Sequence, residues 1–241
     1  EISMRNIIKQ FFMILTLISF GITTSKALVL DVYTIDGVDT QAKRAQMVDG
    51  FNSFKENAVN GGAKWIDFTL NVKIRGDGYR EQFTFAVIYE NATDMMETHE
   101  LFAANQQWFD PFEFDAESAR NAIFETPPGI EVDYQPAQVG QTLWYSFINV
   151  TDLLNFLNRA PKISGVLEDA GMKGQFGILN CTLCPASLGD TTHMMFLTNE
   201  SAMAMGEDLD ALGIDEAIWF YRNVRPFAEQ IDVGMNSVIA N

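Results

Sequence analysis

Both cysteines of the chain and one of its two histidines lie in one short segment, GILNCTLCPASLGDTTHMMFL (177–197). Cys181 and Cys184 form a C-x-x-C pair, a spacing used by disulfides, by thiol redox centres and by metal sites. A thioredoxin-like centre places the pair at the start of a helix, where the helix dipole lowers the thiol pKa. The residues after Pro185 predict a turn and then a strand, so this pattern is not met. Attachment of a c-type haem is also excluded, because Pro185 stands where a histidine is required.

A zinc site needs about four ligands, of which the cysteine pair supplies two. His193 could supply a third, but there is no second C-x-x-C. A disulfide between Cys181 and Cys184 that closes the loop is therefore the favoured interpretation, and no metal site is predicted. A redox-active pair and a metal site remain as alternatives.

The two histidines have different predicted surroundings. His193 begins an expected strand and shares its face with Met195 and Leu197, which is typical of a hydrogen-bonded core residue. His99 lies beside acidic residues in METHELF (96–102), so we expect it on a solvated helix face. A general base needs a partner and a pocket, which neither context identifies. Either imidazole could serve as a haem ligand, but the sequence identifies no cofactor.

Residues 1–27 predict a cleaved secretory signal. Arg5 and Lys9 precede the apolar run FFMILTLISFGI (11–22), and small residues lead to a cleavage point after Ala27. A membrane anchor is the competing interpretation, but the apolar run is shorter than the roughly 20 residues that span a bilayer. We expect an exported protein, periplasmic or extracellular, with no membrane contact after cleavage.

The chain is strongly acidic, with 16 Lys and Arg against 32 Asp and Glu and a formal net charge of -16. Binding to nucleic acid depends on cationic side chains that displace condensed counterions from phosphates. Nucleic acid and anionic membrane surfaces are therefore excluded as predicted partners. The charge favours solubility and does not fix the oligomeric state.

The first half of the mature chain alternates strands and helices. A strand at 28–36 precedes a helix at 40–60, for which Thr40 is the expected N-cap. The segment WIDFTLNVKIR (65–75) alternates apolar and polar residues and pairs through a turn with EQFTFAVIYE (81–90). A helical stretch then runs from Asn91 towards Trp108.

The second half repeats this order. A strand at 141–149 precedes a helical stretch at 150–171 that is expected to bend or restart at Pro161. Two strands flank the cysteine loop, and a long helical stretch follows them. The extended segments GIEVDYQ (129–135) and AEQIDVG (228–234) are available to close the two units. Asn-x-Ser/Thr triplets recur where strands give way to helices, which favours helix capping over glycosylation.

This twofold βαββα order resembles the dimeric α/β-barrel superfamily, whose unit is a ferredoxin-like βαββαβ and which often occurs as a fused tandem. The resemblance implies an α+β protein of two tandem ferredoxin-like units, with antiparallel sheets and outer helices, at 28–138 and 139–241. It also implies a cavity or closed core between the sheets. Members include cofactor-free monooxygenases, haem-binding enzymes and small-molecule isomerases, so the resemblance fixes no activity.

Four polar residues share one face of the strand at 65–75, and they form the candidate cleft together with two residues from the second half. If the other half covers this face, they line a binding pocket. If nothing covers it, they form the wet side of an antiparallel sheet, which is the more common arrangement. The candidate cleft residues are Asp67, Thr69, Asn71, Lys73, Trp144 and His193.

Aromatic residues crowd the segment between the two halves, around Pro111. One interpretation is that they cement the halves together, and the other is a lid over a pocket. The candidate lid residues are Trp108, Phe109, Phe112 and Phe114. The residues after them, AESARNAIF (116–124), predict a short helix capped by Asp115.

The preferred function is binding of a small, apolar or aromatic molecule in a cleft between the two halves. The alternatives are a monooxygenase- or isomerase-like enzyme, a thiol-redox or metal-binding protein that uses the C-x-x-C, and an interaction module. The sequence alone fixes neither the ligand nor a reaction.

Overall fold

The computed structural model describes residues 28–76, 81–112, 118–127 and 134–241. The predicted signal, the turn at 77–80 and Phe114 lie outside these residues, as does most of the expected strand at 129–135.

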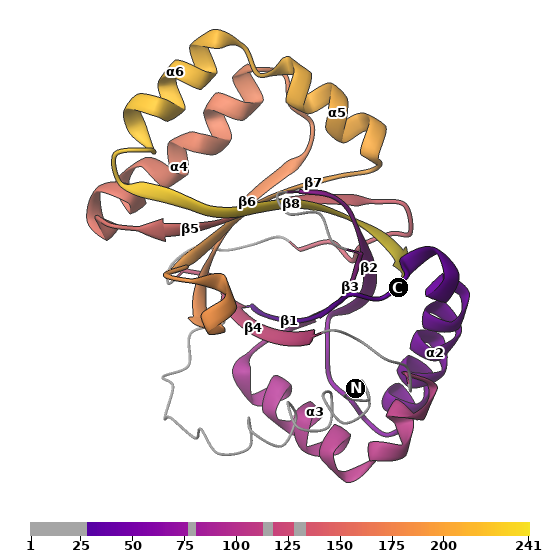
Figure 1. The fold of residues 1–241 in the computed structure, drawn as a ribbon. Helices are drawn as coiled ribbons and strands as arrows, with labels where there is room; N and C mark the ends of the chain where they lie inside the picture. Colours follow the sequence, from indigo (N-terminus) through magenta and orange to yellow (C-terminus); the bar gives the residue numbers. More distant parts are fainter. Residues whose placement is uncertain (1–27, 77–80, 113–117, 128–133) are drawn as a thin grey trace.

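The described chain alternates strands and helices in the order βαββαβ through each half (Figure 1). The elements of the first half are β1 (Val29–Asp36), α2 (Thr40–Asn60), β2 (Asp67–Gly76), β3 (Gln82–Tyr89), α3 (Ala92–Ala104), the 3-10 helix η1 (Gln106–Phe112) and β4 (Ser118–Glu125). Those of the second half are β5 (Thr142–Val150), α4 (Leu153–Asp169), β6 (Gln175–Leu183), the 3-10 turn η2 (Ala186–Leu188), β7 (His193–Asn199), α5 (Ala202–Ala211), α6 (Ile214–Asn223) and β8 (Ala228–Ala240).

The eight strands form one closed barrel in the order β1-β3-β2-β8-β5-β7-β6-β4. Every neighbouring pair is antiparallel, so the predicted α+β class with antiparallel sheets is confirmed. Strands from the two halves meet twice, where β2 pairs with β8 and where β4 pairs with β6. Closure leaves no sheet edge with unpaired backbone groups.

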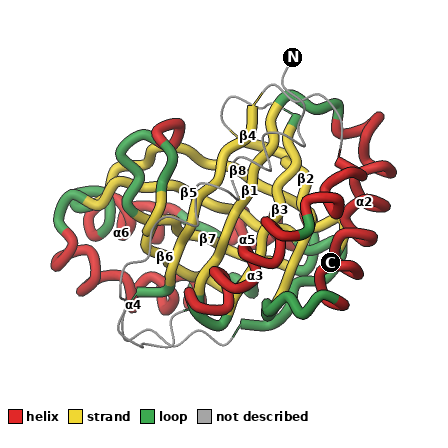
Figure 2. Tube along the Cα trace, turned by 90° about the horizontal axis from the view of Figure 1, so that it is seen from below, coloured by secondary structure: helices red, strands yellow, loops and turns green. Residues whose placement is uncertain are grey.

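The helices lie outside the barrel wall (Figures 1 and 2). α2 and α3 cover the outer face of the first half, and α4, α5 and α6 cover that of the second. Successive side chains of a strand point to opposite faces, so each strand sends one set of residues inward and the other set towards the helices. Both faces are therefore covered, and the polar face of β2 is not a wet surface.

Aromatic side chains fill the space between the first-half strands and their helices. Phe51 and Phe54, one helical turn apart on α2, pack against Phe68 of β2 with ring centroids 4.7 and 5.8 Å away. The 3-10 helix η1 lies on the same cluster, with Phe109 4.9 Å from Phe54. The expected helical stretch after Asn91 thus ends in a turn that seals this outer core.

Two predicted elements differ from the structure. The segment expected to form a helix at 116–124 contains strand β4, which is buried on both faces by the barrel interior and by the helices. A strand buried on both sides lacks a clear apolar–polar alternation, which explains the wrong prediction. The expected restart at Pro161 is also absent, since α4 runs through this residue as one helix.

The helix starts support capping at two of the three Asn-x-Ser/Thr triplets that lie where strands give way to helices. At the third, residues 149–151, the cap of α4 is the following residue, Asp152, whose carboxylate accepts from the amide of Asn155. Asn91 and Ser201 accept hydrogen bonds from the backbone amides of Asp94 and Ala204, as the triplets predict. The cap of α2 is Asp39, not Thr40, because the Asp39 carboxylate accepts from the amide of Ala42 at 2.8 Å.

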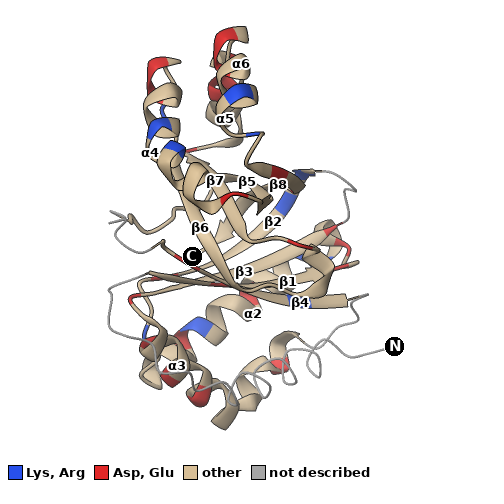
Figure 3. Cartoon of the chain, turned by 90° about the vertical axis from the view of Figure 1, so that its left-hand side faces the viewer, with Lys and Arg blue, Asp and Glu red and all other residues tan. Residues whose placement is uncertain are grey.

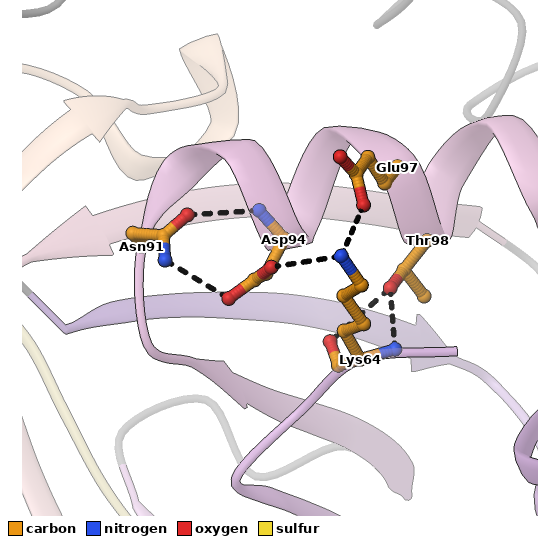
Figure 4. Close-up of polar contacts among 5 residues, drawn as sticks. All are labelled: Lys64, Asn91, Asp94, Glu97 and Thr98. Carbon is orange, nitrogen blue, oxygen red and sulfur yellow. Dashed lines mark hydrogen bonds and ion pairs between the residues drawn. The ribbon is translucent and has the colours of Figure 1, made fainter. Parts of the chain in front are cut away.

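The start of α3 is fastened to the segment before β2 (Figure 4). The Thr98 hydroxyl accepts from the backbone amide of Lys64 at 3.0 Å and donates to its carbonyl at 3.1 Å. The Lys64 ammonium lies 2.6 Å from Glu97 and 3.6 Å from Asp94. These contacts fix the position of α3 over the sheet.

Glycine at position 177 is required by a close approach inside the barrel. The Phe196 ring lies across Gly177, its direct partner on the neighbouring strand, where an added Cβ would collide with the ring. We predict that Gly177→Ala lowers the free energy of unfolding by about 1–3 kcal/mol, because the ring must move. Gly165→Ala, at a position in α4 where a Cβ meets nothing within 4 Å, should raise it by about 0.5–1 kcal/mol. Urea denaturation measures both, and a loss of the same size in the two variants would contradict this account.

Candidate functional site

A cavity of about 160 Å³ lies inside the barrel, and all eight strands contribute residues to its wall. Its lining follows the alternation of the strands, as in β1, where Leu30, Val32 and Thr34 face inward. A single buried water needs only about 10–15 Å³. The barrel is thus wide enough to leave space that its own side chains do not fill.

One side of the cavity is apolar and rich in aromatic rings. Phe124 of β4 and Phe147 of β5 stack with centroids 5.8 Å apart and planes at 9°, and Tyr145 lies 5.1 Å from Phe147. The remaining apolar residues of this side include Leu30, Val32, Leu143, Leu179, Met194 and Phe196.

The other side carries uncharged polar groups on neighbouring strands. Thr34 is paired in register with Thr84, and Thr84 with Asn71, so the three residues form a row across β1, β3 and β2. The Asn71 amide donates to Thr69 Oγ1 at 2.9 Å and to the Thr84 carbonyl at 3.3 Å. Both of its amide hydrogens are therefore used, and its side-chain oxygen is left to accept.

Two further polar groups of the lining lack a hydrogen-bond partner among the described residues. They are the buried side-chain oxygens of Thr142 on β5 and Asn236 on β8. A buried polar atom without a partner costs about 1–3 kcal/mol. A molecule in the cavity that hydrogen-bonds to them would recover part of this cost.

A tyrosine of the cavity lining is hydrogen-bonded to an aspartate at the start of β2. The Tyr134 hydroxyl, which belongs to the lining, donates to Asp67 Oδ2 at 2.6 Å, and the Ala137 amide donates to the same oxygen at 2.8 Å. Burial, together with this hydrogen bond, raises the pKa of Tyr134 well above its usual value. Burial also raises the pKa of Tyr145, with a smaller contribution from Asp232. Both phenols stay neutral at physiological pH.

The structure brings part of the candidate cleft together. Thr69 and Asn71 line the cavity, and Asp67 contacts it through Tyr134. Lys73 is buried on the same face of β2, in register with Asn236, but it is not part of the lining.

Two candidate cleft residues, Trp144 and His193, lie on the other side of the barrel wall. Trp144 packs with the helix-facing core of the second half, while its neighbours Leu143 and Tyr145 line the cavity. The His193 ring contacts Phe156 of α4, with centroids 5.6 Å apart. The alternation of β5 and β7 places both residues outward, which corrects their assignment to the cleft.

The candidate lid residues that are described form part of the outer core of the first half. Phe109 and Phe112 are buried, and Trp108 packs against the same cluster beneath α2. Phe114 lies outside the described residues. The aromatics therefore seal helices onto the first-half sheet; they neither cover the cavity nor, as the competing interpretation had it, cement the two halves.

His99 is fully buried, which corrects the expected solvated position. Its Nε2 donates to Asp31 Oδ2 at 2.8 Å, and the second oxygen of Asp31 accepts from Asn121 at 2.5 Å. The Tyr33 hydroxyl lies 3.3 Å from the same Nε2. This network joins α3 to β1 and β4 on the outer face of the sheet. Neither described histidine faces the cavity, so no imidazole is available to hold a haem there.

The predicted disulfide is confirmed. Cys181 and Cys184 are bonded, with Cα atoms 5.9 Å apart, at the end of β6. Cys181 is in register with Phe124 of β4, so the bridge lies next to one of the two junctions between the halves. In the described part of the chain, no three His, Cys, Asp or Glu side chains gather as a metal site would require.

None of the helices in the described residues is both long and apolar enough to cross a membrane.

Comparisons with known proteins show the fold. A candidate monooxygenase from Fusobacterium nucleatum superposes with a TM-score of 0.57 at 10% identity, covering 90% of this chain and 94% of that chain. One from Lactobacillus acidophilus gives 0.53 at 8% identity, covering 89% and 95%. An anthrone oxidase-like protein gives 0.52 at 14% identity, covering 89% and 92%. No known family profile matches the sequence, and no curated protein is detectably similar to it. The chain therefore shares the α/β-barrel fold of these structures.

The Asp31–His99 pair gives a prediction about stability. The two carboxylate oxygens of Asp31 accept hydrogen bonds from His99 and Asn121. Asp31→Asn replaces one of these oxygens by an amide NH₂ group, which would face the donor of either His99 or Asn121. One of these buried donors therefore loses its acceptor. We expect a loss of about 3–5 kcal/mol in the free energy of unfolding, measured by denaturant titration. Glu97→Gln, at the exposed contact with Lys64, is the matched control and should change stability little. Equal effects of the two variants would contradict the importance of the buried pair.

His193 gives a prediction about pH dependence. Burial lowers its pKa below 6.5, so the folded state binds a proton less readily than the unfolded chain. The contribution of His193 to stability is present above about pH 6.5 and is lost as the pH falls towards the folded-state pKa. We expect the wild type to lose more stability than His193→Gln between about pH 7.5 and pH 5.5, measured by urea denaturation. Parallel pH curves for the two proteins would contradict the shift.

Proposed function

We propose that the chain binds a small, uncharged molecule with one aromatic ring inside the barrel. The cavity, whose wall is lined by residues of all eight strands, is the observation that carries this proposal. An apolar cavity of about 150 Å³ holds benzene in another protein, and this one is of similar size. The aromatic wall around Phe124 and Phe147 offers stacked and edge contacts to such a ring.

Polar side chains on one side of the cavity would orient the ligand. A ring packed against Phe147 and Phe196 would direct a hydroxyl or carbonyl substituent towards Asn71, Thr142 and Asn236. The free oxygens of Asn236 and Thr142 favour a ligand group that donates a hydrogen bond. A phenolic hydroxyl has this property and remains compatible with the apolar remainder of the wall.

A charged ligand is disfavoured. Burial of an ionised group is costly unless an opposite charge and hydrogen bonds compensate it. Among the described residues that line the cavity, Arg120 is the only cationic one. Its guanidinium already lies 3.8 Å from the Asp36 carboxylate. Both tyrosines of the wall are held neutral.

We also infer that the two halves are ferredoxin-like units, with domains at 28–138 and 139–241. The strand orders β4-β1-β3-β2 and β8-β5-β7-β6 within the barrel are the same when each half is numbered from its own first strand. This repeat supports the inference, and it makes the cavity the interface between the units.

Export is a further part of the proposal. The Cys181–Cys184 disulfide supports an oxidising compartment, because disulfides persist there and are rare in reducing ones. The ligand would accordingly be met outside the cytoplasm.

An enzyme of the monooxygenase or isomerase class remains the alternative. The shared fold with candidate monooxygenases is compatible with it. Of the candidate cleft residues, only Thr69 and Asn71 line the cavity, and neither is a usual general base. The geometry therefore supports binding more directly than catalysis.

Calorimetric titration with three probes that share a methylbenzene skeleton tests the proposal. We expect p-cresol to bind with a dissociation constant on the order of 0.1 mM, as suits so small a ligand. Toluene should bind roughly fivefold more weakly, because it lacks the hydroxyl. The p-toluate anion should not bind measurably.

Cavity-filling variants locate the binding. Ala122→Phe and Ala86→Leu place extra side-chain atoms in the cavity and should abolish p-cresol binding. Ala45→Phe, on the exposed surface of α2, is the matched control and should bind as the wild type does. Thermal melting verifies that each variant is folded. Retained binding in both folded cavity variants would place the ligand elsewhere and refute the proposal.

A further inference from the structure

Helix α6 carries an apolar stripe that faces away from the protein. None of its ten residues is buried, and Ile214, Ile218 and Tyr221 are 79, 42 and 65% exposed. Their spacing of four and three residues places them on one face of the helix. The opposite face, with Trp219 and Phe220, packs on the second-half core. The helix is thus docked on one side and apolar on both.

The neighbouring helix also carries exposed apolar side chains. α4 packs beside α6 on the outer face of the barrel (Figures 1 and 3), and at its first turn Leu153 and Leu154 are also exposed. Contiguous exposed apolar side chains are typical of protein interaction sites. This group of residues, Leu153, Leu154, Ile214, Ile218 and Tyr221, is called the α6 surface below.

Charged residues beside the apolar stripe of α6 indicate which kind of partner it would bind. Asp215 and Arg222 are both exposed and lie seven residues apart, so they flank the stripe on the same side about 10 Å from each other along the axis. Neither belongs to the ion pairs found among the described residues. Arg225 lies over the Tyr221 ring, with its guanidinium 5.7 Å from the centroid. The first turn of α6 is acidic and its last turn basic.

The charges along α6 are complementary to those of a second α6 that runs in the opposite direction. In two antiparallel helices related by a twofold axis, residues on the same flank face each other. Asp215 would then lie opposite Arg222 of the second copy, and Arg222 opposite Asp215 of the second copy. The two ion pairs would bracket a central contact formed by Ile218 and Tyr221. Parallel packing about a twofold axis would place the Asp215 and Arg222 flanks of the two copies on opposite sides of the contact and would form neither ion pair.

We propose that the α6 surface binds a second copy of this chain through antiparallel packing of α6 against α6. Two short helices bury less than the roughly 1,600 Å² of a standard interface, so the dimer is weak and forms at high protein concentration. The net charge of -16 also opposes close approach of two copies, which agrees with a weak dimer. The proposal is independent of the cavity and its ligand.

Charge reversal tests the proposal by sedimentation equilibrium, over about 10 to 500 micromolar protein. Asp215→Arg and Arg222→Asp each replace two attractions by two repulsions, so each should raise the dimer dissociation constant roughly fivefold to tenfold. The double variant D215R/R222D restores opposite charges at both positions and should dimerise as the wild type does. Asp49→Arg makes the same charge change as Asp215→Arg on the exposed surface of α2; it is the control for that variant and should leave dimerisation unchanged.

If Asp215 and Arg222 only stabilise α6, the three charge variants should rank in a different order. The native charges also suit the dipole of α6, so on that account the double variant would be the most impaired of the three. Ile218→Asp places a charge at the centre of the contact and should leave only monomer while circular dichroism shows an intact fold. A wild type that is monomeric throughout the range would overturn the proposal. So would a double variant that dimerises no better than the single ones, or a monomer that binds phosphatidylcholine vesicles through this surface.

Discussion

Pairing of strands between the two halves is the constraint on which the rest of the structure depends. β2 with β8 and β4 with β6 close eight strands into one barrel, and closure satisfies the backbone groups that open sheets would expose. Closure also gives every strand one face towards the interior and one towards the outside. One face packs under helices, and the other surrounds a space that no helix can enter. The cavity follows from this geometry and from the size of the side chains that point inward.

The two faces of the wall have different chemistry. On the helix side, aromatic clusters such as Phe51 with Phe68 fill the space, and the buried polar groups of Asp31 and His99 bind one another. On the inner side, the polar row of the first half and an aromatic wall of Phe124, Tyr145, Phe147 and Phe196 line the same cavity. Glycines accommodate two of these rings, at Gly177 beneath Phe196 and at Gly234 beneath Tyr145. The inner wall is therefore ordered around the cavity without being filled.

Much of this arrangement could be predicted from the sequence, where local patterns are strong. The strand β2 alternates clearly, so the shared face of Thr69 and Asn71 was predictable, and the C-x-x-C without a following helix indicated a disulfide. Strand β4 was not predictable, because burial on both faces removes the alternation. The position of His99 was equally hidden, since its partner Asp31 is 68 residues away in the sequence. For β5 and β7, no local signal tells which face turns inward, and Trp144 and His193 proved to lie on the outer one. Asn236 and Tyr134 gave no signal at all, because their role depends on closure.

The central claim is that the barrel holds an aromatic ligand. A crystal structure of the protein soaked with 4-bromophenol tests it directly, because the anomalous signal of bromine marks the position of the ring. The account predicts a bromine peak inside the barrel near Phe124 and Phe147, with the hydroxyl within hydrogen-bonding distance of Asn71, Thr142 or Asn236. A barrel interior filled by its own side chains, or bromine peaks confined to the outer surface, would contradict it.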